Sequence, residues 1–339
     1  MMKTIRRTTE AFEEKYFSPY AQLSINTKGR KILEEECTVR SPYQRDRDRI
    51  IHCEFFRKLK GKTQVFIVQN DTFRTRLTHT LEVSQISRTI ARALRLNEDL
   101  VEAIALGHDL GHTCFGHSGE EVLEKIMGRF KHNEQSLRVV DVLERNRQGL
   151  NLTFEVRDGI LNHTGEGVPV TLEGKLVKLV DTITYLCHDI QDSINGEILT
   201  KEDIPKDIIA LLGETHSQRV NTFVHDIIKE TTLKLEKGEK PNIYQTKALY
   251  NIMMKLRSFM FNTVYNGELC LREKEKATHI VEFLFQNFME KPEELPLLYH
   301  KTAQAEGFKR AVMDYIAACT DNDAIKLFQS KVIPSPKYF

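Results

Sequence analysis

Residues 107–120 read GHDLGHTCFGHSGE, and they place three histidines and two carboxylates within fourteen positions. Imidazole and carboxylate groups together are a common ligand set for Mn, Fe, Co, Ni and Zn ions. The glycines of the segment permit tight turns and close approaches of the backbone. A glycine-rich loop with solvated histidines would have the same composition, but the density of ligand-type side chains favours a functional site.

A helix is predicted to lead into this segment. Asn97 is a good N-cap, and Glu98 and Asp99 follow in the first turn, where negative charge interacts favourably with the helix dipole. The helix should therefore end close to His108 and Asp109. Adjacent helical residues point about 100° apart, so these two side chains can share one ion only if it lies over the helix end.

Two ligands hold a catalytic metal poorly, and two further candidates lie outside the segment. His79 falls at the predicted start of an earlier helix, and Asp181 falls inside an otherwise apolar helix. A buried carboxylate needs a cation or an ion pair, because an unpaired one is strongly destabilising. Taken singly, His79 also fits a helix cap or a core histidine, and Asp181 fits a core salt bridge. Asp181, Tyr185 and Asp189 are spaced four residues apart and should share one helix face.

Helical periodicity dominates the rest of the chain, which predicts an all-α fold. Apolar residues recur at intervals of three and four over residues 83–94 and 176–190, as expected for buried helix faces. Residues 118–121 fit a capping box, so another helix should begin there. The exception is residues 63–68, TQVFIV, which resemble a strand followed by the turn Asn70-Asp71. One short β-hairpin is therefore expected.

The pattern divides the chain into three parts within one globular unit. Residues 1–45 are polar and are expected to form an extended arm or loop. Residues 46–200 should form the catalytic core. Residues 201–339 should form a C-terminal helical region packed on that core, with short breaks at prolines and glycines.

The composition argues against several classes of protein. The chain of 339 residues carries 49 basic and 48 acidic residues, and its formal net charge of +1 argues against a general nucleic-acid coat protein. None of the six cysteines forms a Cys-x-x-Cys pair, which disfavours a zinc ribbon or a thioredoxin-type redox site. Neither a signal peptide nor a membrane-spanning apolar stretch is recognisable. We therefore expect a cytoplasmic enzyme.

The order His79, His108-Asp109 and Asp181 resembles the metal motif of the histidine–aspartate (HD) phosphohydrolase superfamily. Longer segments are similar to its deoxyguanosine triphosphate triphosphohydrolase (dGTPase) branch, and together they span nearly the whole chain. They are RDRDRIIH (45–52), KTQVF (62–66), RTRLTH (74–79), HDLGH (108–112), FGHSGE (115–120) and VMDYIAACTD (312–321). The chain departs from the branch in the run Ala317-Ala318-Cys319 and in its shorter length. The shorter length is consistent with a missing regulatory insertion, which bears on allosteric control and not on the chemistry.

The resemblance implies a role for each residue that it covers, and with them an HD-domain fold. A divalent metal ion (Mn, Mg, Fe, Co, Ni or Zn) would be bound by His79, His108, Asp109 and Asp181. His117 and Glu120 would form the catalytic pair. The substrate would be held by His112 and His132 along a phosphate channel, by Arg76 at a phosphate, and by Gln64, Tyr185 and Asp189 around the deoxyribose.

The implied activity is metal-dependent hydrolysis of dGTP or other deoxynucleoside triphosphates (dNTPs) to a deoxynucleoside and tripolyphosphate. The resemblance also suggests a homo-oligomer and admits a nucleotide effector. Two alternatives stay open: an HD-type nucleoside 5′-monophosphatase, and a nucleotide-sensing or single-strand nucleic-acid-binding subunit. The second is suggested by the basic residues between Arg45 and Lys62, which we interpret as ordinary surface and subunit contacts. The sequence identifies neither the metal nor the preferred base.

Overall fold

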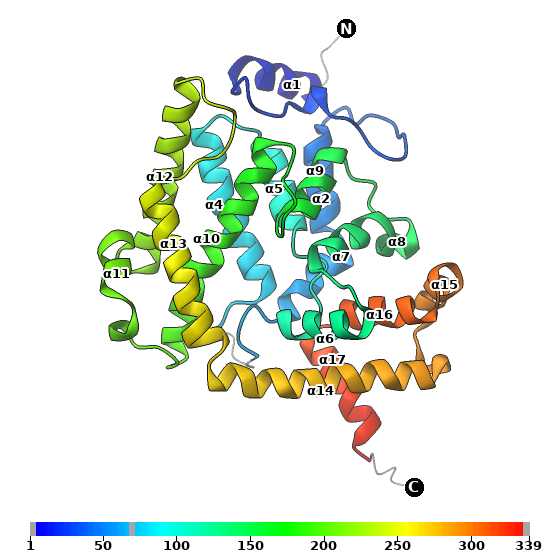
Figure 1. Ribbon diagram of the computed structural model, residues 1–339. Helices are drawn as coiled ribbons and strands as arrows, with labels where there is room; N and C mark the ends of the chain where they lie inside the picture. Colours follow the sequence, from blue (N-terminus) through cyan, green and yellow to red (C-terminus); the bar gives the residue numbers. More distant parts are fainter. Residues whose placement is uncertain (1–4, 68–71, 335–339) are drawn as a thin grey trace.

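The computed structural model describes residues 5–67 and 72–334, and these residues form helices and loops without a β-sheet (Figure 1). The predicted all-α fold is confirmed. The α-helices are α1 (Ile5–Tyr16), α2 (Pro42–Ile51), α3 (Glu54–Lys58), α4 (Arg76–Ala93), α5 (Glu98–Gly107), α6 (His117–Met127), α7 (His132–Arg138), α8 (Glu144–Arg147), α9 (Phe154–Asn162), α10 (Leu172–Asn195), α11 (Lys206–Leu212), α12 (His216–Glu236), α13 (Lys247–Met260), α14 (Glu268–Glu290), α15 (Leu297–Glu306), α16 (Phe308–Ala318) and α17 (Asp321–Val332). No helix among the described residues combines the length and apolarity needed to cross a bilayer.

The central helix is α10, which packs against α4, α5, α9, α12 and α13 (Figure 1). Its apolar stripe over residues 176–190 is buried as predicted, apart from the partly exposed Leu179. Each fully buried leucine or isoleucine contributes about 1.5–3 kcal/mol to the stability of the fold. Because α4 and α5 pack against α10 and against each other, the start of α4, the end of α5 and the middle of α10 can meet at one point.

The prediction of a β-hairpin at residues 63–68 is wrong for residues 63–67, which the structure describes. Residues 63–67 form a loop, with one isolated antiparallel bridge between Thr63 and Thr75. The predicted turn Asn70-Asp71 lies outside the described residues. The N–H of Thr63 donates to Asp321 Oδ2 at 2.9 Å, at the start of α17. The backbone N–H of Thr63, which a second strand could have paired, is therefore satisfied by a carboxylate from a distant helix.

The N-terminal segment is not an extended arm or loop throughout, because its residues 5–16 form α1. Glu13 of α1 is buried and accepts hydrogen bonds from the N–H and the hydroxyl of Ser24, at 2.6 and 2.7 Å. The N–H of Gln22 donates to Glu173 Oε1 of α10 at 3.0 Å. These contacts attach the segment to the helical core.

The C-terminal helices are joined to the core through polar contacts as well as apolar ones. Helix α14 runs across the base of the molecule in Figure 1 and packs against α6, α16 and α17. Lys62 is buried and donates to the carbonyl oxygen of Ala317 in α16 at 2.8 Å, and also to the carbonyl oxygen of His112. Arg138 of α7 pairs with the buried Asp314 of α16 at 2.6 Å. The loop that follows α5 is thereby fastened to the C-terminal region.

Asn97 caps α5 as the sequence predicted, and this cap holds the helix that delivers His108 and Asp109. Its Oδ1 accepts from the N–H of Leu100 at 3.2 Å, and its Nδ2 donates to the carbonyl oxygen of Gln22 at 3.0 Å. Replacing Asn97 with alanine should lower the free energy of unfolding by about 1–2 kcal/mol, the usual cost of a lost N-cap. Urea denaturation measures this loss. Asn97→Ser keeps an acceptor and should recover most of it, whereas equal losses in both variants would contradict the capping role.

Candidate active site

The four side chains predicted to bind a metal come together where α4, α5 and α10 meet. His79 Nε2 lies 3.0 Å from Asp181 Oδ1 and 3.9 Å from Asp109 Oδ2. His108 Nε2 lies 3.3 Å from Asp109 Oδ1 and 3.7 Å from Asp181 Oδ1. Ligands of one ion are spaced roughly 3–3.5 Å apart when each metal–ligand bond is about 2.1 Å long. His79, His108 and Asp181 therefore stand close to the spacing that a shared ion requires, and Asp109 lies beside them, with Oδ1 towards His108 and Oδ2 towards His79.

His108 provides the test of whether these residues fit a metal ion. Its Nδ1 lies 2.6 Å from the carbonyl oxygen of Ala105. A carbonyl oxygen can only accept, so Nδ1 carries the proton and Nε2 offers a lone pair. That Nε2 is buried and has no hydrogen-bond partner among the described residues. A buried lone pair without a partner needs an explanation, and a cation coordinated at this atom supplies one.

The two aspartates of the group are held as carboxylates. Burial alone would raise the pKa of Asp109, but the neighbouring rings of His108 and His112 and the guanidinium of Arg76 outweigh burial and hold this pKa well below its usual range. Burial also acts to raise the pKa of Asp181, and the contact with His79 and the neighbouring ring of His108 lower it to about 2. Both groups are therefore negative at neutral pH and suited to a divalent cation.

Arg76 lies behind the predicted ligands in this structure. It is buried, and its Nη1 donates to Asp109 Oδ2 at 3.0 Å. Its Nε donates to the carbonyl oxygen of Thr63 at 3.1 Å, and its Nη2 lies 3.4 Å from that of Gln64. The guanidinium thus fixes the Asp109 carboxylate and the loop of residues 63–64, in addition to any contact it makes with a phosphate.

A second cluster contains the predicted catalytic pair and the two predicted channel histidines. His117 Nδ1 lies 3.0 Å from Glu120 Oε2, and the backbone N–H of His132 donates to Glu120 Oε1 at 2.8 Å. His112 stacks on His132 with ring centroids 4.0 Å apart. His112 Nε2 lies 3.3 Å from Asp109 Oδ1, which joins this cluster to the four predicted ligands.

The contact between Glu120 and its neighbouring histidines shifts the pKa values of the second cluster. Burial would raise the pKa of Glu120, but the charge of His132 and hydrogen bonds from His117 and His132 bring it far below its usual range. Burial would lower the pKa of His132, and the charge of Glu120 raises it above the ordinary value instead. Burial, with the charges of Arg76 and His132, lowers the pKa of His112, so its imidazole is neutral. In contrast, the His117 side chain is 67% exposed and can face a bound molecule.

The loop that carries His108 to His117 depends on two glycines. A Cβ on Gly111 would lie 2.1 Å from the backbone nitrogen of Ser136 in α7, so no larger residue fits there. Gly116 has a φ of +56° and is the N-cap of α6. The capping box predicted at Ser118 is therefore wrong, although a helix does begin here, at His117. The glycine N-cap turns the chain so that His117 stands at the exposed first position of α6.

The remaining predicted substrate residues lie in several elements. Gln64 is buried in the loop before α4, and its Oε1 has no hydrogen-bond partner among the described residues. Tyr185 follows Asp181 by one turn of α10, and burial raises its pKa to about 12. Asp189 follows one turn later and is buried, with its Oδ2 accepting from the hydroxyl of Tyr265 at 2.5 Å. The predicted common face of α10 is thus present.

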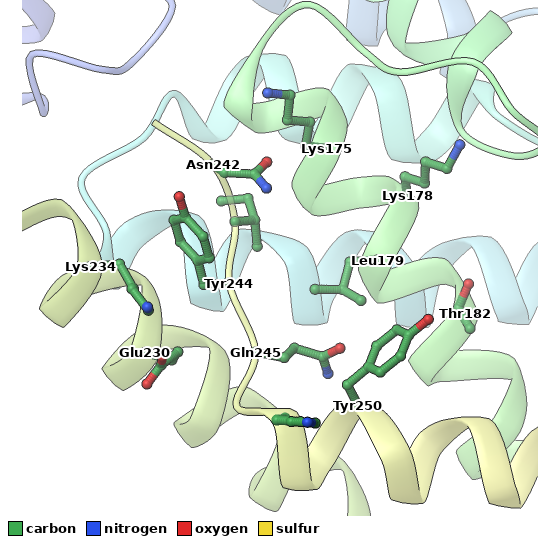
Figure 2. A pocket seen from close by; sticks show the side chains of 12 residues that line it. Lys175, Lys178, Leu179, Thr182, Glu230, Lys234, Asn242, Tyr244, Gln245 and Tyr250 are labelled. Atoms are coloured by element: carbon green, nitrogen blue, oxygen red, sulfur yellow. The ribbon is translucent and has the colours of Figure 1, made fainter. Parts of the chain in front are cut away.

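A hollow of about 680 Å³ lies beside this face, between α10 and the chain that links α12 to α13 (Figure 2). Thr182, the residue after Asp181, lines this hollow, and none of the four predicted ligands does. Its basic residues outnumber its single acid, Glu230. The side chains drawn in Figure 2 include Lys175, Lys178, Leu179, Lys234, Asn242, Tyr244, Gln245 and Tyr250.

Three residues at the site, His163, His188 and Tyr265, were not predicted from the sequence. His163 Nε2 lies 3.3 Å from His132 Nε2, and burial, with the charges of His108 and His132, lowers the pKa of His163 to about 3. His188 Nε2 lies 2.9 Å from His79 Nδ1. Tyr265 reaches Asp189 from the π-helical turn Phe261–Tyr265, which follows α13. Only His188 had a local signal, because it follows Asp181 by seven residues and so shares its helix face.

Comparisons with known proteins place these residues in a family context. The HD domain matches residues 76–186, which include all four predicted ligands, and the phosphohydrolase-associated domain matches residues 245–330. The chain is 52% identical over 334 residues to a deoxyguanosinetriphosphate triphosphohydrolase-like protein of Caldanaerobacter subterraneus subsp. tengcongensis, covering 98% of this chain and 97% of that protein. A protein of the same name from Clostridium perfringens is 47% identical, covering 97% of this chain and 98% of its own. The crystal structure of a hypothetical protein from Aquifex aeolicus aligns at 18% identity with a TM-score of 0.47, over 83% of this chain and 67% of that one.

Proposed function

The chain belongs to the family of deoxyguanosinetriphosphate triphosphohydrolase-like proteins and contains their HD domain, and on this premise we propose that it hydrolyses dNTPs to a deoxynucleoside and tripolyphosphate. The resemblance found in the sequence is thereby confirmed at the level of the family. The observation that carries the proposal is the convergence of His79, His108, Asp109 and Asp181, with the pair His117–Glu120 beside them.

The metal centre would be formed by these four residues. A divalent ion held there would offset the negative charge of a triphosphate and polarise its α-phosphoryl group. The chain itself contributes Arg76, which orients the carboxylate of Asp109, and His132, whose pKa the charge of Glu120 raises. Positive groups fixed in a buried site stabilise developing negative charge more strongly than the same groups in water.

His117 is our proposed general acid. Water forms a bond to the α-phosphorus and gives up a proton, while the bond from that phosphorus to the 5′-oxygen breaks. The leaving 5′-alkoxide needs a proton. With Nδ1 of His117 beside Glu120 Oε2, the ring keeps its proton on Nδ1, and Nε2 can carry a second proton to donate. The exposure of His117 allows this nitrogen to reach the leaving oxygen.

The decisive test of the proposed function is product identification. The purified chain is incubated with each dNTP in turn and, separately, with nucleoside 5′-monophosphates, with Mn²⁺ or Mg²⁺ and with a chelator as control. Our proposal predicts a deoxynucleoside and tripolyphosphate, formed only with metal. Inorganic phosphate released from nucleoside monophosphates would support the monophosphatase alternative instead, and no product from either substrate would contradict hydrolysis at this site.

The alternative of a nucleic-acid-binding subunit receives little support from the basic run between Arg45 and Lys62. Arg47 pairs with Asp48, Asp99 and Glu102, and Arg49 pairs with Glu34. Charges that are matched within the chain attract a phosphate backbone less strongly than a free basic stripe. These ion pairs favour the interpretation as ordinary surface contacts.

Tyr185 is our proposed selector for deoxyribose, because a ring placed against C2′ would leave no room for a 2′-hydroxyl. Replacing Tyr185 with alanine should raise kcat/KM for GTP relative to dGTP at least ~10-fold, the scale of discrimination that a filled pocket provides. Steady-state assays with both nucleotides measure the ratio. Tyr185→Phe keeps the ring and should keep the selectivity. An alanine variant that still rejects GTP as the wild type does would refute steric exclusion by this residue.

A further inference from the structure

His188 lies directly behind the proposed metal centre and has no part in the mechanism above. It is fully buried in α10, and its Nε2 lies 2.9 Å from Nδ1 of His79. The two rings meet edge to face, with centroids 5.1 Å apart. His79 therefore uses its two ring nitrogens for two different partners, Nε2 towards Asp181 and Nδ1 towards His188.

The direction of the hydrogen bond between the two histidines follows from metal binding. A neutral imidazole has one N–H and one lone pair. If His79 Nε2 offers its lone pair to an ion, Nδ1 carries the proton and donates it to His188. His188 Nε2 must then be the acceptor, so the proton of this second ring stands on Nδ1, which faces Asp189 Oδ1 at 2.6 Å, at angles outside those of a hydrogen bond. The other oxygen of Asp189 accepts from the Tyr265 hydroxyl at 2.5 Å.

We propose that His188 is a positioning residue of the metal centre: it holds His79 in the tautomer and orientation that present Nε2 to the ion. The carboxylate of Asp189 lies against Nδ1 of His188, and Tyr265 donates to that carboxylate. This inference rests on the metal centre of the proposed function. The second nitrogen of a metal-bound histidine usually has such a partner, and loss of the partner typically lowers metal affinity or activity about 10–100-fold. The corresponding partner of His108 Nδ1 is the carbonyl oxygen of Ala105, which can only accept a hydrogen bond. His188 Nε2 can accept from His79 only while the proton of the His188 ring is on Nδ1.

Two polar substitutions separate this role from simple packing. His188→Gln places an amide oxygen near the position of Nε2, where it can still accept from His79. His188→Asn is one methylene shorter and leaves His79 Nδ1 without that acceptor. The affinity of the full chain for Mn²⁺ alone, measured by calorimetry without nucleotide, should fall at least ~10-fold in His188→Asn and stay close to wild type in His188→Gln. Saturating Mn²⁺ should restore most of the turnover of His188→Asn, since the loss lies in metal affinity.

Thr184 offers a matched control, because it is fully buried one turn earlier on α10 and its hydroxyl has no hydrogen-bond partner among the described residues. Thr184→Val should leave the affinity for Mn²⁺ unchanged. Equal affinities in the wild type and both His188 variants, or equal losses in the two variants, would overturn the role of His188 and leave the metal centre in place. A wild-type chain that binds no Mn²⁺ would overturn the metal centre and this inference together.

A second measurement keeps the inference testable if His188→Asn does not fold. The ¹⁵N chemical shifts of a histidine ring report which nitrogen carries the proton. In the wild-type chain loaded with Zn²⁺, His188 should be the neutral tautomer protonated on Nδ1, and His79 should be protonated on Nδ1 and metal-bound through Nε2. A proton on His188 Nε2 would overturn the proposal without reference to any variant or to turnover.

Discussion

Replacing Asp181 with alanine should lower dNTP turnover at least ~1,000-fold, because a bound ion supplies several kcal/mol of transition-state stabilisation and each 1.36 kcal/mol is tenfold in rate. Asp181 is the proposed ligand that comes from α10, and its Oδ1 lies 3.0 Å from His79 Nε2 and 3.7 Å from His108 Nε2. Removing this carboxylate takes away a negative charge on which both imidazoles converge. The remaining ligands would hold a divalent ion weakly.

Two measurements check this prediction besides turnover. The metal content of the dialysed protein should fall in Asp181→Ala. Saturating Mn²⁺ should raise the melting temperature of the wild type, since a ligand at 100 times its Kd stabilises the folded state by about 2.7 kcal/mol. The variant should show little of that increase.

Asp158→Asn is the control for the loss of one aspartate away from the site. The Asp158 carboxylate accepts from Asn162 Nδ2 at 2.9 Å and from the N–H of Val170 at 2.8 Å, and neither partner is a proposed ligand. Asp158→Asn should therefore keep its metal and its turnover. An Asp181→Ala variant with wild-type metal content and wild-type turnover would remove this residue from the metal centre.

Replacing His117 with alanine should lower turnover at least ~100-fold while metal content stays normal, which is the usual scale for a lost acid–base group. His117 stands at the first position of α6, outside the four proposed ligands, and its Nδ1 lies 3.0 Å from Glu120 Oε2. Its side chain is largely exposed, so the substitution leaves no buried cavity and should change the free energy of unfolding little.

The combination of lost turnover with retained metal distinguishes His117 from Asp181. His225→Ala is the matched control, because His225 is an exposed histidine of α12. It should behave as the wild type in both assays. Near-wild-type turnover of His117→Ala would exclude this residue as the general acid, and loss of metal from the variant would make it a ligand instead.

The parts of this protein that are encoded within a few neighbouring residues could be predicted from the sequence. The N-cap Asn97 and the acidic turn after it are local, and α5 begins as predicted. The buried stripe of α10 over residues 176–190 is a repeat of three and four residues, which only a helix turns to one side. The four proposed ligands were single candidates by their residue type and place in the predicted helices, and the resemblance to the HD superfamily joined them into one set.

Where a local preference competed with a distant partner, prediction failed. Residues 63–67 have strand-forming side chains, but a strand is stable only beside another strand. In this fold Asp321 and Arg76 bind the polar groups of Thr63 instead, and neither contact is visible in the segment itself. The helix α1 and the glycine cap of α6 were missed for the related reason that contacts elsewhere in the chain stabilise them.

The sequence by itself determined that the chain is helical and which side chains could bind a metal or move a proton. The tertiary structure alone decided which atoms meet: that Nε2 of His79 lies beside an aspartate 102 positions away, and that its Nδ1 lies beside His188. Helix propensity and capping act over a turn or two, so they can be recognised in neighbouring residues. The packing of α4, α5 and α10 is the sum of many weak contacts between distant residues, and it sets distances and ring orientations that no single segment encodes.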